Sequence, residues 1–168
     1  DVYIINTCSV TNIADRKSRQ MIHKAKKLNP DAIVAATGCY VEAAGDNVDE
    51  DVDIAIGNNE KSRLVEILDS YFSDVCEEKH THADINKVTD FDDMFMEAPM
   101  EHTRAYVKIQ DGCNRFCTYC IIPYVRGRIR SRQRDDIFNE VSSLARKGCA
   151  EVVLTGIHLS SYGLDMGG

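Results

Sequence analysis

Three cysteines stand within eight residues near the middle of the chain. Cys113, Cys117 and Cys120 have CxxxCxxC spacing and directly follow Gly112. Three thiolates on so short a loop can converge on one metal ion or one iron–sulfur cluster. A structural zinc or a fully ligated cluster usually takes four protein ligands, so three close ones predict a cluster with one open iron. Zinc with a distant fourth ligand is the alternative.

An arginine-rich run follows this loop. Residues 104–134 contain eight basic residues and one acid, whereas residues 74–102 contain nine acids and two lysines. The net charge of −7 over 168 residues therefore hides a local basic region that favours an anionic partner. Arginine binds phosphate bidentately, so we expect the run to contact an RNA backbone, with a solvated charged surface as the alternative. Its members are Arg126, Arg128, Arg130 and Arg132.

Aromatic side chains accompany the cysteines. Tyr119 and Tyr124 are predicted to stack on an unpaired base, as is Phe116, for which core packing is an equal alternative. Seven cysteines form an odd and unevenly spaced set, which argues against a secreted disulfide framework and favours a reducing cytoplasm. Cys76 and Cys149 are interpreted as structural or incidental. No apolar run approaches the ~20 residues of a membrane span, so we expect no membrane partner.

The sequence pattern predicts an α/β fold that starts with a parallel sheet. A strand, a helix and a second strand in this order form a parallel crossover unit. Cys8 and Cys39 then fall just past the carboxyl ends of two strands, the edge where open α/β sheets bind ligands; two buried core thiols are the alternative. The expected elements are strands at 2–6, 32–36 and 52–56, a helix from Thr11 or Asn12 to Asn29, and a helix over 60–72.

A second α/β unit is predicted after an acidic stretch. Alternating apolar residues indicate a strand over 104–109, and a helix over 135–147 ends at Gly148. A strand over 151–155 follows. The loop between the strand 104–109 and the helix, from Gln110 to about Gln133, is far longer than an ordinary βα connection, and such long loops are commonly functional. The predicted domains are an α/β domain at 1–73, a linker at 74–103 and a barrel segment at 104–168.

Several of these motifs resemble the radical S-adenosylmethionine enzymes. The CxxxCxxC loop with Tyr119 before its last cysteine carries this resemblance, and the whole stretch GCNRFCTYCIIPYVRGRIRSR is similar to the signature of the methylthiotransferase branch. Residues 6–10 (NTCSV) and 37–40 (TGCY) resemble two cysteine motifs of that branch's N-terminal domain. Residues 154–158 (LTGIH) with Tyr162-Gly163 are most similar to the subgroup that acts on threonylcarbamoyladenosine in tRNA.

The resemblance implies a fold, cofactors and partners. The fold would be a flavodoxin-like domain lacking its first strand, followed by the first βα units of a partial TIM barrel. Cys113, Cys117 and Cys120 would hold a 4Fe-4S cluster whose open iron binds S-adenosylmethionine, which is cleaved to a deoxyadenosyl radical. Cys8 and Cys39 would be two of three ligands of an auxiliary 4Fe-4S cluster that supplies sulfur.

Further residues receive roles from the same resemblance. Tyr119, Thr155 and Gly156 would contact S-adenosylmethionine, and the arginine run would bind the tRNA substrate. His158 would lie near the cofactor, although a lone histidine is more often a packing or hydrogen-bonding residue. An electron donor of flavodoxin or ferredoxin type would be a further partner. The oligomeric state stays open.

The chain also departs from the family pattern. The first N-terminal cysteine motif, most barrel strands and the C-terminal RNA-binding domain are not in this sequence, so we interpret it as a fragment and expect it to be inactive alone. The expected reaction of the whole enzyme is methylthio transfer to carbon 2 of threonylcarbamoyladenosine beside the tRNA anticodon. The alternatives are isopentenyladenosine in tRNA, a ribosomal-protein aspartate, or a non-catalytic iron–sulfur or zinc module that binds RNA.

Overall fold

The computed structural model describes residues 1–73, 80–81, 85–92 and 104–167. Its contacts divide the chain into two units. The N-terminal unit comprises residues 1–88 together with 116–127, and the C-terminal unit comprises residues 89–115 together with 128–168. The segment 116–127, which contains Cys117 and Cys120, therefore packs with the first sheet, which the sequence did not predict. The domain boundaries drawn from the sequence stay a prediction.

A parallel sheet with strand order β1-β2-β3-β4 forms the centre of the N-terminal unit. The predicted parallel α/β class is confirmed. The fourth strand lies inside the stretch predicted to be a linker, and two residues are too short to show a strand period in sequence. The strands are β1 (Val2–Thr7), β2 (Ile33–Gly38), β3 (Ile54–Ile56) and β4 (His80–Thr81).

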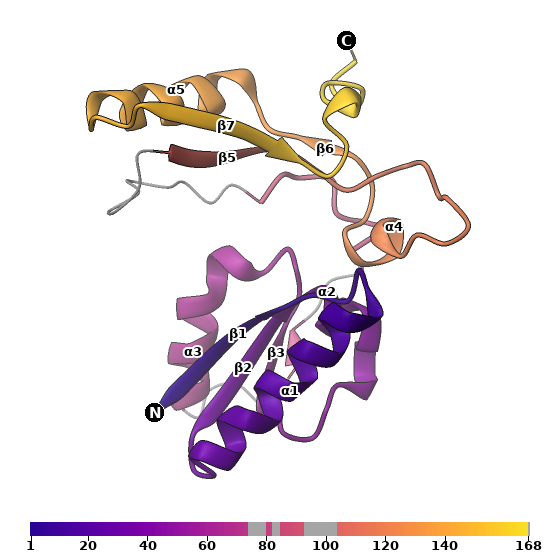
Figure 1. Ribbon diagram of the computed structural model, residues 1–168, viewed down its shortest axis with the longest axis vertical. Coiled ribbons are helices and arrows are strands. Elements are labelled where there is room, and N and C mark those ends of the chain that lie inside the picture. Colours follow the sequence, from indigo (N-terminus) through magenta and orange to yellow (C-terminus); the bar gives the residue numbers. More distant parts are fainter. Residues whose placement is uncertain (74–79, 82–84, 93–103, 168) are drawn as a thin grey trace. The chain divides into compact units, whose positions relative to one another are not determined.

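Helix α1 (Asn12–Leu28) covers one face of this sheet (Figure 1). The Thr11 hydroxyl caps it by accepting a hydrogen bond from the Ala14 N–H at 3.1 Å. Ile22 and Ala25, three residues apart on one side of the helix, enter the core with Val34 of β2. The predicted bounds of this helix are confirmed.

The opposite face of the sheet packs against α3 (Leu64–Phe72). Strand side chains alternate between faces, so Ala35 contacts Ile67 of α3 while its neighbour Val34 faces α1. A 3₁₀ turn, η2 (Lys61–Arg63), precedes α3, so the α-helix starts later than predicted. Between β2 and β3 lie α2 (Cys39–Ala44) and a 3₁₀ turn, η1 (Gly45–Asn47), which the sequence pattern did not reveal.

The C-terminal unit is built on a three-stranded sheet with order β6-β5-β7. Strands β5 (Arg104–Asp111) and β7 (Glu151–Gly156) are parallel, and β6 (Arg130–Ser131) is antiparallel to β5. Helix α5 (Arg134–Arg146) connects them and packs on one face, where Leu144 is fully buried (Figure 1). This β–α–β crossover matches the unit predicted to begin a partial barrel.

The end of α5 follows the predicted signal. Gly148 adopts φ +87°, its N–H donates to the Ala145 carbonyl, and the Cys149 N–H donates to the Leu144 carbonyl. This pair of bonds is a Schellman motif, which needs a residue that tolerates positive φ. Cys149 packs beside the core and its thiol lies 3.2 Å from the Glu151 carbonyl oxygen, a structural setting.

Short elements complete the described chain. The long loop after β5 contains β6 and a four-residue helix, α4 (Ile122–Val125), and a 3₁₀ turn, η3 (Leu159–Ser161), follows β7. None of the helices in the described ranges is long and apolar enough to cross a membrane. Cys76 lies outside the described residues.

Candidate functional site

Cys8 and Cys39 follow two paired strands of the N-terminal sheet. Thr7 and Gly38, the last residues of β1 and β2, are partners in the parallel register, so each cysteine is the next residue at the same sheet edge. This predicted placement is confirmed. Whether the two thiols bind a cluster stays a prediction.

The backbone at Gly38 fixes where Cys39 begins. Gly38 has φ +109°, and a Cβ atom placed there would lie 2.3 Å from the Thr7 carbonyl oxygen. Only glycine allows so close an approach of two backbones. The Thr7 hydroxyl donates to the Thr37 carbonyl at 2.6 Å and accepts from the Tyr40 N–H at 3.3 Å. The turn into α2 is therefore held on both sides of the cysteine.

The Cys39 side chain is buried and has polar neighbours. It is 1% exposed, and the Arg126 Nε donates a hydrogen bond to its Sγ at 3.2 Å. The Asn58 amide nitrogen lies 3.9 Å from the same sulfur and donates to the Val125 carbonyl at 2.7 Å. The Cys39 sulfur therefore lies beside a cationic and an amide nitrogen, although the side chain is buried. Segment 116–127 thus supplies the polar surroundings of Cys39.

Cys8 is held through its backbone and keeps its side chain exposed. The Cys8 N–H donates to the Ser18 hydroxyl at 3.0 Å. The same hydroxyl is within donor distance of the Cys8 carbonyl at 3.1 Å and of the Ala14 carbonyl at 3.0 Å. The first turns of α1 therefore position Cys8. An exposed thiol beside a buried one gives this edge two different cysteine environments.

The CxxxCxxC loop leaves β5 through a constrained turn. Gly112 has φ +69° and Phe116 has φ +46°, an uncommon value for a residue with a side chain. Cys113 lies in the C-terminal unit, whereas Cys117 and Cys120 lie in the N-terminal unit, where the Cys120 N–H donates to the Cys117 carbonyl at 2.9 Å. All three are free thiols, the donor chemistry that an iron–sulfur cluster needs.

The aromatic residues of the loop have distinct settings. Tyr119 is 91% exposed, so its ring is available to a ligand. Phe116 and Tyr124 pack edge to face, with ring centroids 5.7 Å apart and planes at 86°. This pair stabilises the segment, in keeping with the packing alternative for Phe116. The prediction that these rings stack on a base stays open.

Gln110 is a site residue that sequence reasoning missed. It is fully buried, and its amide nitrogen donates to the Asp111 carbonyl at 2.7 Å and to the Gly112 carbonyl at 2.8 Å. Its amide oxygen accepts from the His158 N–H at 2.7 Å. One side chain therefore joins the start of the cysteine loop to the loop after β7. The available signal was a glutamine at a strand end directly before Asp-Gly-Cys.

The side chains of Asp111 and Asn114 also form hydrogen bonds that position this loop. The Asp111 carboxylate accepts from the Gly112 N–H at 2.8 Å and from Lys108 Nζ at 3.1 Å. The Asn114 side-chain oxygen accepts from the Ile129 N–H at 3.1 Å. Hydrogen bonds thus fix the residues on both sides of Cys113, buried or half-buried before the cysteine and exposed after it.

Thr155 and Gly156, the residues predicted to contact the cofactor, are the last two of β7, and Gly156 pairs with Gln110 in the parallel register. A Cβ atom on Gly156 would be 3.0 Å from Gln110 Oε1, and the Thr155 hydroxyl is 3.4 Å from the Val107 carbonyl oxygen. His158 is half-buried, and its Nδ1 lies 2.6 Å from the Ser161 hydroxyl. His158 therefore forms hydrogen bonds, which was the alternative to a role near the cofactor.

The four arginines of the run do not share one environment. Arg128 is exposed and Arg126 half-buried, but Arg130 and Arg132 are 3% and 2% exposed. Arg132 forms an ion pair with the buried Glu140 of α5, and an Arg130 nitrogen lies 3.9 Å from the Asp111 carboxylate. The alternative of a solvated surface strand with four outward arginines is therefore wrong for Arg130 and Arg132. The expected contact of the run with an RNA backbone stays a prediction. Arg130, the first residue of β6, and Arg132, which directly follows the strand, are both turned inward, where buried carboxylates pair with them.

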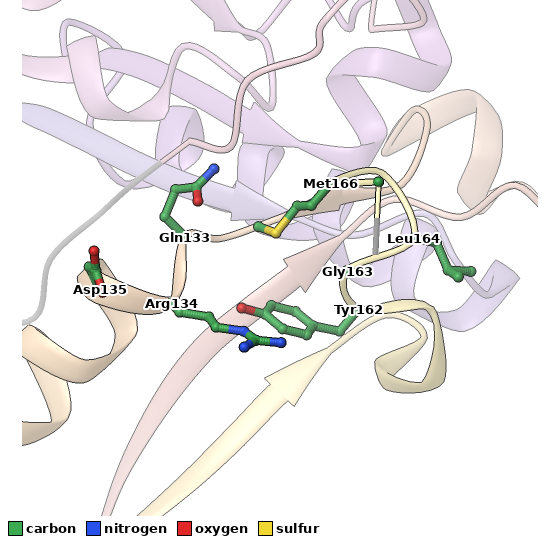
Figure 2. Close-up of a pocket in the computed structure, with 8 residues that line it drawn as sticks. Gln133, Arg134, Asp135, Tyr162, Gly163, Leu164 and Met166 are labelled. Atoms are coloured by element: carbon green, nitrogen blue, oxygen red, sulfur yellow. The ribbon is translucent and has the colours of Figure 1, made fainter.

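A cavity of about 560 Å³ opens in the C-terminal unit where α5 begins. Figure 2 shows Arg134 beside the Tyr162 ring, with Gln133 and Met166 on the other side. The Tyr162 hydroxyl donates to the Arg132 carbonyl at 2.9 Å, which holds the ring in place. The volume is in the range of small-molecule sites. Sequence reasoning did not identify this cavity, because its lining comes from two segments far apart in the sequence, the start of α5 and the residues after η3.

Comparisons with known proteins agree with this arrangement. Residues 1–57 match the uncharacterized protein family UPF0004, and residues 107–163 match the Radical SAM superfamily. A threonylcarbamoyladenosine tRNA methylthiotransferase of Aquifex aeolicus is 46% identical over 99% of this chain and 41% of its own length. The protein of the same name from Bacillus subtilis is 40% identical over 99% of the chain and 37% of its own length.

A relative with a different printed substrate is also similar. The tRNA-2-methylthio-N(6)-dimethylallyladenosine synthase of Carboxydothermus hydrogenoformans is 38% identical over the whole chain and 39% of its own length. The chain thus spans about two fifths of the length of these curated relatives. Similarity over both units, and not over the cysteine loop alone, links the two sheets to one type of protein.

Proposed function

This chain belongs to the radical SAM methylthiotransferase family, and from that premise we propose that the full-length protein transfers a methylthio group to carbon 2 of threonylcarbamoyladenosine in tRNA. The observation that carries the proposal is the loop of three free thiols directly after β5, at the carboxyl end of the parallel pair β5–β7. Membership of the family implies S-adenosylmethionine and an iron–sulfur cluster as cofactors.

In this proposal the chain's own residues position the cofactors. Cys113, Cys117 and Cys120 would hold a 4Fe-4S cluster, which would supply an electron for the cleavage of S-adenosylmethionine. Gln110 and Asp111 fix the backbone of the loop before Cys113. The exposed Tyr119 ring and the Thr155-Gly156 backbone contact S-adenosylmethionine.

The N-terminal unit would hold the second cluster. Cys8 and Cys39 supply two ligands at one sheet edge, and the third comes from outside this chain. The hydrogen bond from Arg126 to the Cys39 sulfur offsets negative charge on that ligand. A flavodoxin or ferredoxin provides electrons, and the cytoplasm is the expected compartment.

The buried arginines receive a role different from that of the exposed one. Arg128 contacts the tRNA backbone, whereas the Arg126 guanidinium donates to the Cys39 sulfur. Arg130 and Arg132 position β6 through Asp111 and Glu140, and so act on RNA only through the shape of the loop.

Activity on two defined tRNAs tests the proposal. The full-length protein, reconstituted anaerobically, is given tRNA with threonylcarbamoyladenosine or tRNA with dimethylallyladenosine, and the nucleosides are analysed by mass spectrometry. We expect a methylthio product from the first tRNA, together with deoxyadenosine. Cys117→Ala should abolish both products. A product only from the second tRNA would assign the substrate of the dimethylallyladenosine relative instead, and a colourless zinc protein that ignores S-adenosylmethionine would refute the enzyme.

A further inference from the structure

The outward side of α1 carries a stripe of basic residues. At 3.6 residues per turn, Arg16, Lys17, Lys24 and Lys27 fall within about 100° of the helix circumference. All four are exposed, and the stripe lies opposite Ile22, which enters the core. The stripe therefore lies on the side of α1 that faces away from the core.

The remaining cations of α1 have acidic partners, and the stripe does not. In the described part of the chain, none of the four stripe residues forms an ion pair. The pairs of the remaining cations are Arg19–Asp15 at 2.8 Å, His23–Asp49 at 2.7 Å and Lys26–Asp53 at 2.6 Å.

The stripe contrasts with the charge of the chain as a whole. The 17 residues of α1 contain six lysines and arginines and one acid, whereas the whole chain has a net charge of −7. From Arg16 to Lys27 the stripe extends about 16 Å along the helix axis. It begins beside Cys8, because Ser18 in the same turns hydrogen-bonds to the Cys8 backbone.

We propose that this stripe, Arg16, Lys17, Lys24 and Lys27, is a docking surface for the phosphate backbone of tRNA, in addition to Arg128. The inference rests on the proposed function, which supplies the polyanion. A line of separated long cations is the pattern of phosphate contacts, which position a nucleic acid without reading its sequence. A protein partner such as an acidic electron donor is disfavoured, because α1 has no aromatic residue and lysine is depleted in protein interfaces.

The salt dependence of tRNA binding measures the contacts directly. The full-length protein and its Lys17→Gln/Lys24→Gln/Lys27→Gln variant are titrated with unfractionated bacterial tRNA between 50 and 300 mM KCl. Each lost phosphate contact lowers the slope of log K against log salt by about one, so we expect the slope to fall by about three. Glutamine is nearly as good a helix former as lysine, so α1 should stay folded, which circular dichroism checks.

A matched control distinguishes the loss of phosphate contacts at the stripe from a general loss of positive charge. Arg63 is exposed in the same unit but pairs with Glu60 at 2.8 Å and Glu66 at 3.3 Å, so Arg63→Gln should leave the slope unchanged. An unchanged slope in the triple variant would overturn the docking surface. So would normal tRNA binding combined with weaker binding of a reduced flavodoxin. If the wild-type protein bound no tRNA, the proposed function itself would fall, whereas tRNA binding without the triple-variant effect would leave it intact.

Discussion

The two sheets hold their cysteines in different ways. At the N-terminal sheet, Cys39 is buried at a point where the Gly38 and Thr7 backbones approach too closely for any side chain. At the C-terminal sheet, the residues before Cys113 are fixed by the polar side chains of Gln110 and Asp111. One edge depends on packing and the other on hydrogen bonds. Mutations of different chemistry should therefore disrupt each edge.

The largest effect is expected from Gly38→Ala. The new methyl group would meet the Thr7 carbonyl oxygen at 2.3 Å at a backbone φ of +109°, so β1 and β2 must separate at their ends. Clash and strain together should lower the free energy of unfolding by about 3 kcal/mol or more. Thermal unfolding of the full-length protein measures this loss.

Gly45→Ala is the matched control for that change. Gly45 also has a positive φ, +54°, but a Cβ atom there would meet nothing within 4 Å. It should lose only the strain of the backbone, about 1–3 kcal/mol, because there is no clash to add to it. Equal losses in the two variants would contradict the close approach of β1 and β2 as the feature that fixes Cys39.

Gln110→Glu should have the next largest effect and act on the other edge. A carboxylate can accept from the His158 N–H but cannot donate to the Asp111 and Gly112 carbonyls. Leaving buried acceptors unsatisfied costs about 1–3 kcal/mol. We expect that loss in unfolding, and an altered electron paramagnetic resonance signal of the reduced cluster in the reconstituted protein.

The exposed Gln20 of α1 provides the control for the added charge. Gln20→Glu introduces the same carboxylate with no buried partner, so its stability and cluster signal should match the wild type. A normal cluster signal in Gln110→Glu would show that the loop does not depend on this side chain.

The contrast also explains what sequence reasoning found and missed. The strands other than the two-residue β4 and β6, helix α1 and the αL end of α5 follow from local periodicity and capping, and both cysteine edges follow from strand ends. The position of segment 116–127 could not be predicted, because it depends on the long-range bonds of Arg126 and Asn58. The inward turn of Arg130 and Arg132 was also hidden, since Glu140 and Asp111 become partners only after folding.

A smaller effect should follow from removing a polar contact at the packed edge. Arg126→Ala deletes the hydrogen bond to Cys39 Sγ, which contributes about 1 kcal/mol. Local opening around Cys39 should then be about fivefold more frequent, and alkylation of this thiol in metal-free full-length protein about fivefold faster. Peptide mass spectrometry gives the rate. Arg128→Ala, which removes an exposed neighbour, should not change it; equal rates in all three proteins would exclude the contact with Arg126.

The smallest expected effect is a pH dependence of stability that only the N-terminal unit should show. Among the described ion pairs, only the N-terminal unit has a histidine with a carboxylate, His23 with Asp49, while those of the C-terminal unit join lysine or arginine to carboxylates. The hydrogen bond to Asp49 raises the pKa of His23. Burial would raise the pKa of Asp49, but hydrogen bonds from His23 and the Asp51 N–H outweigh it and lower that pKa.

These two shifts define a window of added stability. The contribution of His23 is complete below its unfolded pKa of about 6.5 and is lost as pH rises through its raised folded pKa, while that of Asp49 is present above about pH 4. Because the His23 side chain is 56% exposed, the coupling should stay below about 1 kcal/mol. A double-mutant cycle of His23→Gln and Asp49→Asn should show coupling in thermal unfolding at pH 5.5 and none at pH 8.5. Coupling that is equal at both values would mean that the pair stabilises the N-terminal unit as neutral hydrogen-bonding partners, without the charge on His23.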